Sequence, residues 1–224
     1  MVRALAILLL AVQTLPAPGS EVLDRVAVAA GQQAVTMVEI LRHLRFRAIL
    51  SGVSVEDTEQ NRRQAAEQLL DLLIVRRELE LSRYSPPAMA EADTAIEAFL
   101  AEMKWSRERL AAELLRAGFT EEEFRREMQA RLTVTRFIDY RFAPGVQVTD
   151  EEVQAYYDTE FLPALREASP GAAVPGLAAV RPVIERILTT RKVNAAMEDW
   201  LKQMRQNLRI RYFEEAFRPV GGPR

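Results

Sequence analysis

Residues 118–157 read GFTEEEFRREMQARLTVTRFIDYRFAPGVQVTDEEVQAYY and contain the same helix-start signal twice. Thr120 lies three positions before Glu123, and Thr149 lies three positions before Glu152. In such a capping box, the threonine hydroxyl and the glutamate carboxylate each bind a backbone N–H group that a helix start leaves unpaired. The acidic residues behind each threonine also face the positive end of the helix dipole. The stretch therefore predicts a long amphipathic helix between the two boxes and another helix after the second box.

Helical spacing of apolar residues extends this pattern over most of the chain. A further capping box, Thr36 with Glu39, predicts another helix start, and Pro86-Pro87 separates two of the helices that follow. We predict helices at about residues 36–51, 58–83, 90–103, 106–117, 120–141, 149–165 and 180–204.

Two segments at opposite ends of this helical region alternate in the way that strands do. Apolar residues alternate with smaller or polar ones at about 22–30, and with arginines at about 208–213. A lone strand cannot satisfy its backbone, so we expect these two segments to pair, with a short second strand at 34–35 after a turn at 31–33. The predicted fold class is therefore mainly α, with a small β pairing of the N-terminal and C-terminal strands.

The first 19 residues have the layout of a secretory signal peptide. Arg3 supplies positive charge, residues 4–12 form an apolar run, and small residues lead to Gly19, near which we predict cleavage. The apolar run is too short to cross a membrane, and its retention as an N-terminal anchor is the alternative. The sequence therefore predicts a periplasmic or otherwise exported protein with no stable membrane span after signal cleavage. It contains no cysteine, and therefore no disulfide.

Side chains that carry catalysis or bind metals are few and poorly grouped. The formal net charge of −2 gives no general attraction to nucleic acid. His43 is the single histidine and has no cysteine partner, and no glycine-rich phosphate loop is present. The acidic runs after Thr120 and Thr149 fit capping better than acid–base chemistry. We therefore predict no catalytic, metal-binding or cofactor-binding residues.

Methionine and aromatic side chains are abundant enough to predict an apolar binding surface in addition to a core. Flexible thioethers beside aromatic rings suit a surface that accepts many apolar segments, although the same residues at helical spacing also fit an ordinary core. Met89, Phe99, Met103 and Trp105 flank the weakest predicted helix and the Pro86-Pro87 break. We predict that these four side chains bind polypeptide in an exposed apolar groove.

Taken in order, the motifs resemble the N-terminal chaperone region of the SurA- and PrsA-type periplasmic foldases. The matching segments are residues 22–28, 35–40, 63–71, 118–125, 146–157 and 192–210. The resemblance implies a split chaperone domain of residues 20–165 and 179–214, followed by a flexible tail at 215–224. Family members usually carry parvulin-type prolyl isomerase domains of about 100 residues between the two parts, where this chain has only a linker at 166–178. The resemblance therefore implies peptide binding without isomerase activity.

The predicted function is that of an exported, ATP-independent chaperone that binds unfolded or newly translocated polypeptides during outer-membrane or envelope protein biogenesis. Two alternatives stay open. One is a protein related to the parvulin prolyl isomerases with residual or no activity, and the other is an envelope adaptor subunit with one fixed partner. The expected partners are unfolded polypeptide clients and not nucleic acid, and no cofactor is expected. The identity of the clients and the oligomeric state do not follow from the sequence.

Overall fold

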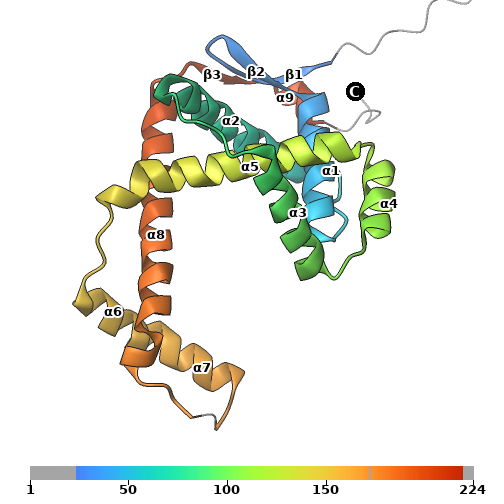
Figure 1. Cartoon of the computed structure of the whole chain (residues 1–224). Coiled ribbons are helices and arrows are strands. Elements are labelled where there is room, and N and C mark those ends of the chain that lie inside the picture. The colour runs from blue at the N-terminus through green and yellow to red at the C-terminus, as the bar shows by residue number, and fades with distance from the viewer. Residues whose placement is uncertain (1–23, 172, 219–224) are drawn as a thin grey trace, which may run out of the picture.

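A computed structural model describes residues 24–171 and 173–218 of the chain, and most of these residues are helical (Figure 1). The longer helices are α1 (Met37–Ser51), α2 (Glu59–Ser82), α3 (Met89–Met103), α4 (Arg107–Ala117), α5 (Glu121–Phe142) and α8 (Leu177–Gln206). The shorter ones are α6 (Asp150–Tyr156), α7 (Leu162–Ala168), α9 (Glu214–Phe217) and the 3-10 turn η1 (Ala143–Gly145). The mainly α fold class is therefore confirmed.

A small antiparallel sheet joins the two ends of this helical region, as the alternating segments predict. It contains β1 (Val26–Ala30), β2 (Gln33–Thr36) and β3 (Ile210–Tyr212) in the order β2-β1-β3. Ala30 pairs with Gln33 of β2 on one side and with Ile210 of β3 on the other. β1 is thus the central strand, and the C-terminal strand completes its backbone hydrogen bonds.

The three predicted capping boxes are all formed. In the box that begins α5, the Glu123 backbone N–H donates to Thr120 Oγ1 at 3.1 Å, and the Thr120 N–H donates to Glu123 Oε2 at 2.8 Å. The boxes of Thr36 and Thr149 begin α1 and α6 in the same way. Local sequence therefore determines where these three helices begin.

The larger of two apolar cores lies between the sheet and α2. Its buried side chains include Val28 of β1, Leu70 of α2, Phe137 of α5, Leu201 of α8 and Phe217 of α9. In Figure 1, α2 lies beneath the sheet, and α5 and the upper part of α8 pass beside it. Helices that are distant in sequence therefore meet in one body under the sheet.

The second core holds α3 and α4 against α1 and the start of α5. It contains Phe46 and Ile49 of α1, Leu100 of α3, Leu114 of α4 and Phe124 of α5. The ring centroids of Phe46 and Phe124 are 5.7 Å apart. This arrangement places α4 beside α1, which matters for the candidate site.

An arm formed by α6, α7 and the adjoining part of α8 lies at the end of α8 remote from the sheet (Figure 1). Val153 of α6 and Ile184 of α8 are buried within it. Arg191 of α8 forms two hydrogen bonds of 2.8 Å to the carboxylate of Glu160. The arm is thus held by a small apolar contact and by ion pairs near its surface.

The helix predicted at 149–165 is interrupted at its centre. α6 ends at Tyr156, and Tyr157–Phe161 form a wider π-helical turn before α7 begins. Pro163 supplies a physical reason, because it has no N–H for the carbonyl of Thr159, and its ring displaces that carbonyl. The sequence pattern predicted a helix here but not the π-helical turn at its centre.

The predicted flexible tail and the predicted linker are both shorter than expected. Residues 215–217 of the predicted tail belong to α9, where the Phe217 side chain has 0% exposure because it packs into the main core. The predicted linker at 166–178 loses both ends to helices, since α7 runs to Ala168 and α8 begins at Leu177. The predicted signal peptide and residues 219–224 lie outside the described residues.

Candidate functional site

An open pocket of about 670 Å³ lies between α1, α4 and the segment that connects α1 to α2, and we call it the α1–α4 groove. Apolar side chains from all three parts line it. They are Leu41, Leu44, Ala48 and Ile49 of α1, Val53 and Val55 of the connecting segment, and Trp105 before α4. Val53 at its edge is 66% exposed, so the groove opens to solvent. The size and lining suit a small apolar ligand or a few side chains of a peptide.

Gly52 determines how the end of α1 meets the turn before α4. It has a φ of 66° and ends α1 in the left-handed conformation that glycine adopts without strain. A methyl group on its Cα would lie 2.5 Å from Met103 Cε and 3.5 Å from Trp105 Cζ2. A side chain at this position would therefore displace the end of Met103, while its distance to Trp105 would be an ordinary van der Waals contact.

The structure brings together three of the four predicted peptide-binding residues. Phe99 and Trp105 have ring centroids 5.8 Å apart, and Met103 and Trp105 both contact the end of α1. Only Trp105 lines the α1–α4 groove, and Met89 lies at the opposite end of α3. All four side chains are half-buried. Peptide binding by these residues stays a prediction.

Charged side chains surround the apolar lining of the groove. The Arg109 guanidinium lies 4.7 Å from the centroid of the Trp105 ring, within cation–π range. Arg45 Nη1 donates to the carbonyl oxygen of Ala117 at 3.3 Å, which ties α1 to the end of α4. Glu113 and Arg116 form an ion pair at 2.7 Å. The rim therefore carries both signs of charge around an apolar floor.

A buried arginine supports the end of the groove nearest α2. Arg62 lies almost entirely out of solvent and binds the Asp57 carboxylate through Nε at 2.5 Å and Nη2 at 2.7 Å. Hydrogen bonding from Arg62 holds the pKa of Asp57 below its usual value. The same guanidinium donates to the carbonyl oxygens of Phe217 at 3.3 Å and Arg218 at 3.1 Å. Arg62 thus links the connecting segment to α9.

The acidic runs at the starts of α5 and α6 have the capping geometry that the sequence predicts. Hydrogen bonds from Thr120 lower the pKa of Glu123, and an ion pair with Lys192 together with the Thr149 N–H lowers the pKa of Glu152. The lowered pKa favours the ionised form of each carboxylate, and each accepts a hydrogen bond from the backbone N–H of its capping threonine. Among the described residues, no group of three His, Cys, Asp or Glu side chains is arranged to hold a metal ion.

Sequence reasoning missed most of the groove lining. Leu41, Leu44 and Ile49 show the helical spacing of core residues, and nothing in that spacing distinguishes a groove wall from a packed interface. Leu44 and Ile49 are each 4% exposed and form the buried floor of the groove, while Leu41 is half-buried. The signal that was available is Gly52 before the apolar pair Val53 and Val55, which marks an apolar connecting segment.

Comparison with known proteins establishes a likeness of fold. No family model matches the chain, and no curated protein matches it. The structure is similar to a solved structure from Campylobacter jejuni described among PEB4 and Cj1289, "two structurally related SurA-like chaperones". The TM-score is 0.51 at 11% sequence identity, and the match covers 84% of this chain and 99% of that chain. The chain therefore has a fold like that of SurA-like chaperones. Within the described ranges, no helix is both long and apolar enough to cross a membrane.

Proposed function

We propose that the protein is an exported, ATP-independent chaperone that binds unfolded or newly translocated polypeptides through apolar contacts. The α1–α4 groove carries this proposal, because it presents Trp105 beside aliphatic side chains in an open pocket of about 670 Å³. The fold likeness to SurA-like chaperones supports it. Export rests on the predicted signal peptide at residues 1–19.

The chemistry of the groove fits weak, adaptable binding. The half-buried Leu41 and Ala48 and the exposed Val53 offer apolar contact without hydrogen bonds. Trp105 adds a large ring beside the flexible thioether of Met103. A surface of this kind accepts different apolar segments, because little in it depends on exact directional contacts. A chaperone that binds the unfolded chain and not the native one lowers the free concentration of aggregation-prone polypeptide by mass action.

We propose no prolyl isomerase activity. In the resemblance described above, an isomerase domain of about 100 residues would lie between α7 and α8. Residues 169–176 alone connect these helices here. A connection of this length is too short to form a domain with a core of its own. We therefore place the proposed activity in the helical body and the arm.

Tryptophan fluorescence tests the groove directly, because the chain contains two tryptophans, Trp105 and Trp200. In a Trp200→Phe variant, Trp105 is the only reporter, and we expect its emission to shift when a short apolar peptide is added. In a Trp105→Phe variant, Trp200 reports instead. Trp200 packs against Phe142 on α5, away from the groove, so its emission should stay constant.

A blocking variant tests whether binding at the groove protects clients. Ala48 lines the groove, and Ala48→Glu would place a long charged side chain in it, with peptide affinity reduced at least about tenfold. Ala98 is an exposed residue of α3, so Ala98→Glu is the matched control. Aggregation of several unrelated unfolded proteins should be suppressed by the wild type and the control but not by Ala48→Glu.

Other results of these assays would contradict the proposal. Suppression of no client would remove the chaperone function, and binding of one protein only would favour an adaptor subunit. Acceleration of proline isomerisation in a model peptide would favour the isomerase alternative. Equal activity of the Ala48→Glu and Ala98→Glu variants would place the binding surface outside the groove.

A further inference from the structure

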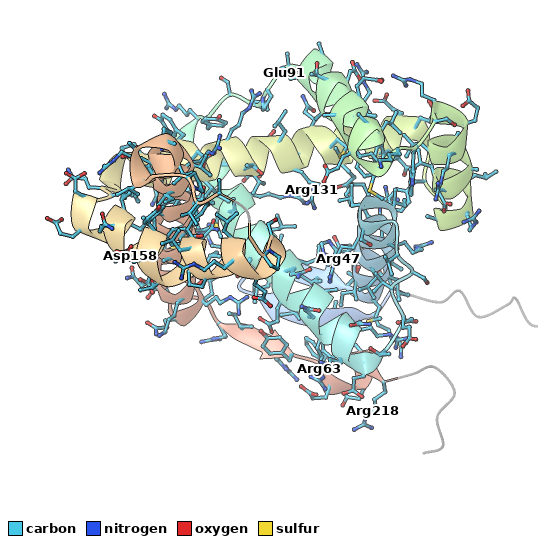
Figure 2. All side chains as sticks on the ribbon, turned by 90° about the horizontal axis from the view of Figure 1, so that it is seen from below. Arg47, Arg63, Glu91, Arg131, Asp158 and Arg218 are labelled. Carbon is cyan, nitrogen blue, oxygen red and sulfur yellow. The ribbon has the colours of Figure 1, made fainter. Side chains whose placement is uncertain are left out.

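A second pocket, of about 460 Å³, lies where α1, α2 and α5 meet and is lined largely by polar and basic side chains. Residues from three helices meet there: His43, Arg47 and Leu50 of α1, Gln68 and Leu72 of α2, and Arg131 of α5. Figure 2, which views the molecule from below, labels Arg47 and Arg131 near the middle of the view, and both side chains line this pocket. We call this set the basic pocket.

The two arginines of the basic pocket have no carboxylate of their own among the described residues. Ion pairs in that part of the chain use other arginines, including Arg125 and Arg136 on α5. Arg47 Nη1 makes one long hydrogen bond of 3.4 Å to Gln68 Oε1, a neutral acceptor. Arg131 is exposed to solvent. Two guanidinium groups from different helices therefore face one pocket with their charge uncompensated at close range.

His43 completes the polar wall as a neutral group. Its Nε2 lies 2.9 Å from Gln68 Oε1, and because that oxygen is an acceptor, Nε2 carries the ring proton. Burial lowers the pKa of His43, and the charges of Arg47 and Arg131 lower it further, while the hydrogen bond with Gln68 and the charge of Glu127 on α5 act in the opposite direction. The pocket thus presents two fixed positive charges beside an uncharged imidazole.

We propose that the basic pocket binds a carboxylate of the bound polypeptide, either its C-terminal group or an acidic side chain. The inference rests on the proposed function and deepens it by naming a polar feature of the client. A guanidinium presents two N–H groups that match a carboxylate, and Arg47 and Arg131 approach from two helices. Leu50 and Leu72 lie in the same pocket and offer contact to the aliphatic part of a residue that carries the carboxylate.

His43 is the only histidine of the chain, so the NMR titration of its imidazole reports on this pocket alone. The probes are a short apolar peptide with a free or an amidated C terminus, and the amidated peptide with a central Asp or Asn. A bound carboxylate favours the imidazolium form, so we expect the pKa of His43 to rise with the charged peptides only. A rise in the pKa of His43 with the free C terminus would identify the terminal carboxylate as the bound group, and a rise with the central Asp would identify an acidic side chain.

Substitution of the arginines tests the contact itself. The charged peptides should bind about tenfold more tightly than the neutral ones, and Arg47→Gln or Arg131→Gln should remove most of that difference. Arg209 is an exposed arginine beside β3, so Arg209→Gln is a matched control that should change nothing. The far-ultraviolet circular dichroism of each variant checks its fold.

The outcomes separate this inference from the chaperone proposal. Equal binding of charged and neutral peptides, with no response of His43, would overturn the carboxylate site and leave the chaperone function intact. A rise in the pKa of His43 with inorganic phosphate but not with acetate would also overturn it. Failure of every peptide to bind would remove the proposed function, and a response of His43 to acetate would still support a carboxylate pocket.

Discussion

Phe217→Ala should destabilise the whole protein, although position 217 lies close to the end of the chain. The Phe217 side chain is fully buried in the main core, and the Arg63 guanidinium lies 4.8 Å from its ring centroid. Two further contacts anchor the same segment: Arg62 donates to the Phe217 carbonyl at 3.3 Å, and Arg63 pairs with Glu214. The substitution would remove the ring and leave these polar contacts in place.

The magnitude follows from the burial. Complete burial of a phenylalanine side chain contributes about 1.5–3 kcal/mol of transfer free energy, and an unfilled cavity adds to the loss. Phe→Ala substitutions in cores therefore cost about 3–5 kcal/mol. α9 is only four residues long, so it can partly collapse into the space, which favours the lower end, about 3 kcal/mol. For a chain of this size, such a loss lowers the melting temperature by roughly 6–12 °C.

Thermal and urea unfolding followed by far-ultraviolet circular dichroism measure this effect. Leu115→Ala is the control, because Leu115 is 82% exposed and its removal should change the free energy of unfolding by less than about 0.5 kcal/mol. Phe217→Leu should fall between the wild type and Phe217→Ala, since leucine refills part of the cavity. If Phe217→Ala melted together with Leu115→Ala, the C-terminal helix would not belong to the core, and residues 215–217 would be part of a flexible tail.

Three further substitutions test local features. Asp57→Asn should lower the free energy of unfolding at neutral pH by about 1–2 kcal/mol, a figure reduced for the exposure of Asp57. Arg62 depresses the folded-state pKa of Asp57, so this difference should hold above about pH 4 and vanish in stronger acid, as urea titrations across pH can establish; a constant difference would contradict the ion pair. Gly52→Ala should cost about 1–2 kcal/mol in a thermal melt because of the positive φ and the close Met103, and an unchanged melt would refute that packing. Thr149→Ala should cost about 1 kcal/mol at the start of α6, seen as faster amide exchange there, and protection equal to wild type would argue against the capping box.

Local signals in the sequence were sufficient to predict three helix starts and the pairing of the N-terminal strand with the C-terminal strand. Thr36, Thr120 and Thr149 each act within a few residues, so their roles do not depend on distant packing. The pairing of β1 with β3 was predictable because two isolated alternating segments each need a partner. α9 was missed, although Phe213, Ala216 and Phe217 have the spacing of a buried helical face, because a single turn gives too few residues to establish a period.

The candidate site was predictable only in part, because exposure is a property of packing and not of pattern. Trp105 was predicted from its neighbours in the sequence, while Leu41 shares the helical spacing of the core residue Leu44, which is 4% exposed. The basic pocket was even harder to predict from the sequence. Arg47 and Arg131 lie on α1 and α5, with α2, α3 and α4 between them in the sequence, so no local spacing connects them. Both surfaces depend on the way α1 is placed between α2, α4 and α5.

The arm and the rest of the helical body are stabilised by different kinds of contact, and this difference predicts which part opens first. α8 contains 30 residues, about 45 Å of helix, with Leu201 in the main core at one end and Ile184 in the arm toward the other. The arm relies on half-exposed ion pairs such as Arg191–Glu160, and pairs of this kind contribute little to stability. The body has two apolar cores and fixes both the α1–α4 groove and the basic pocket on α1. Segments with few buried contacts open most readily, so we expect the arm to open more readily than the part of α1 that carries the α1–α4 groove and the basic pocket.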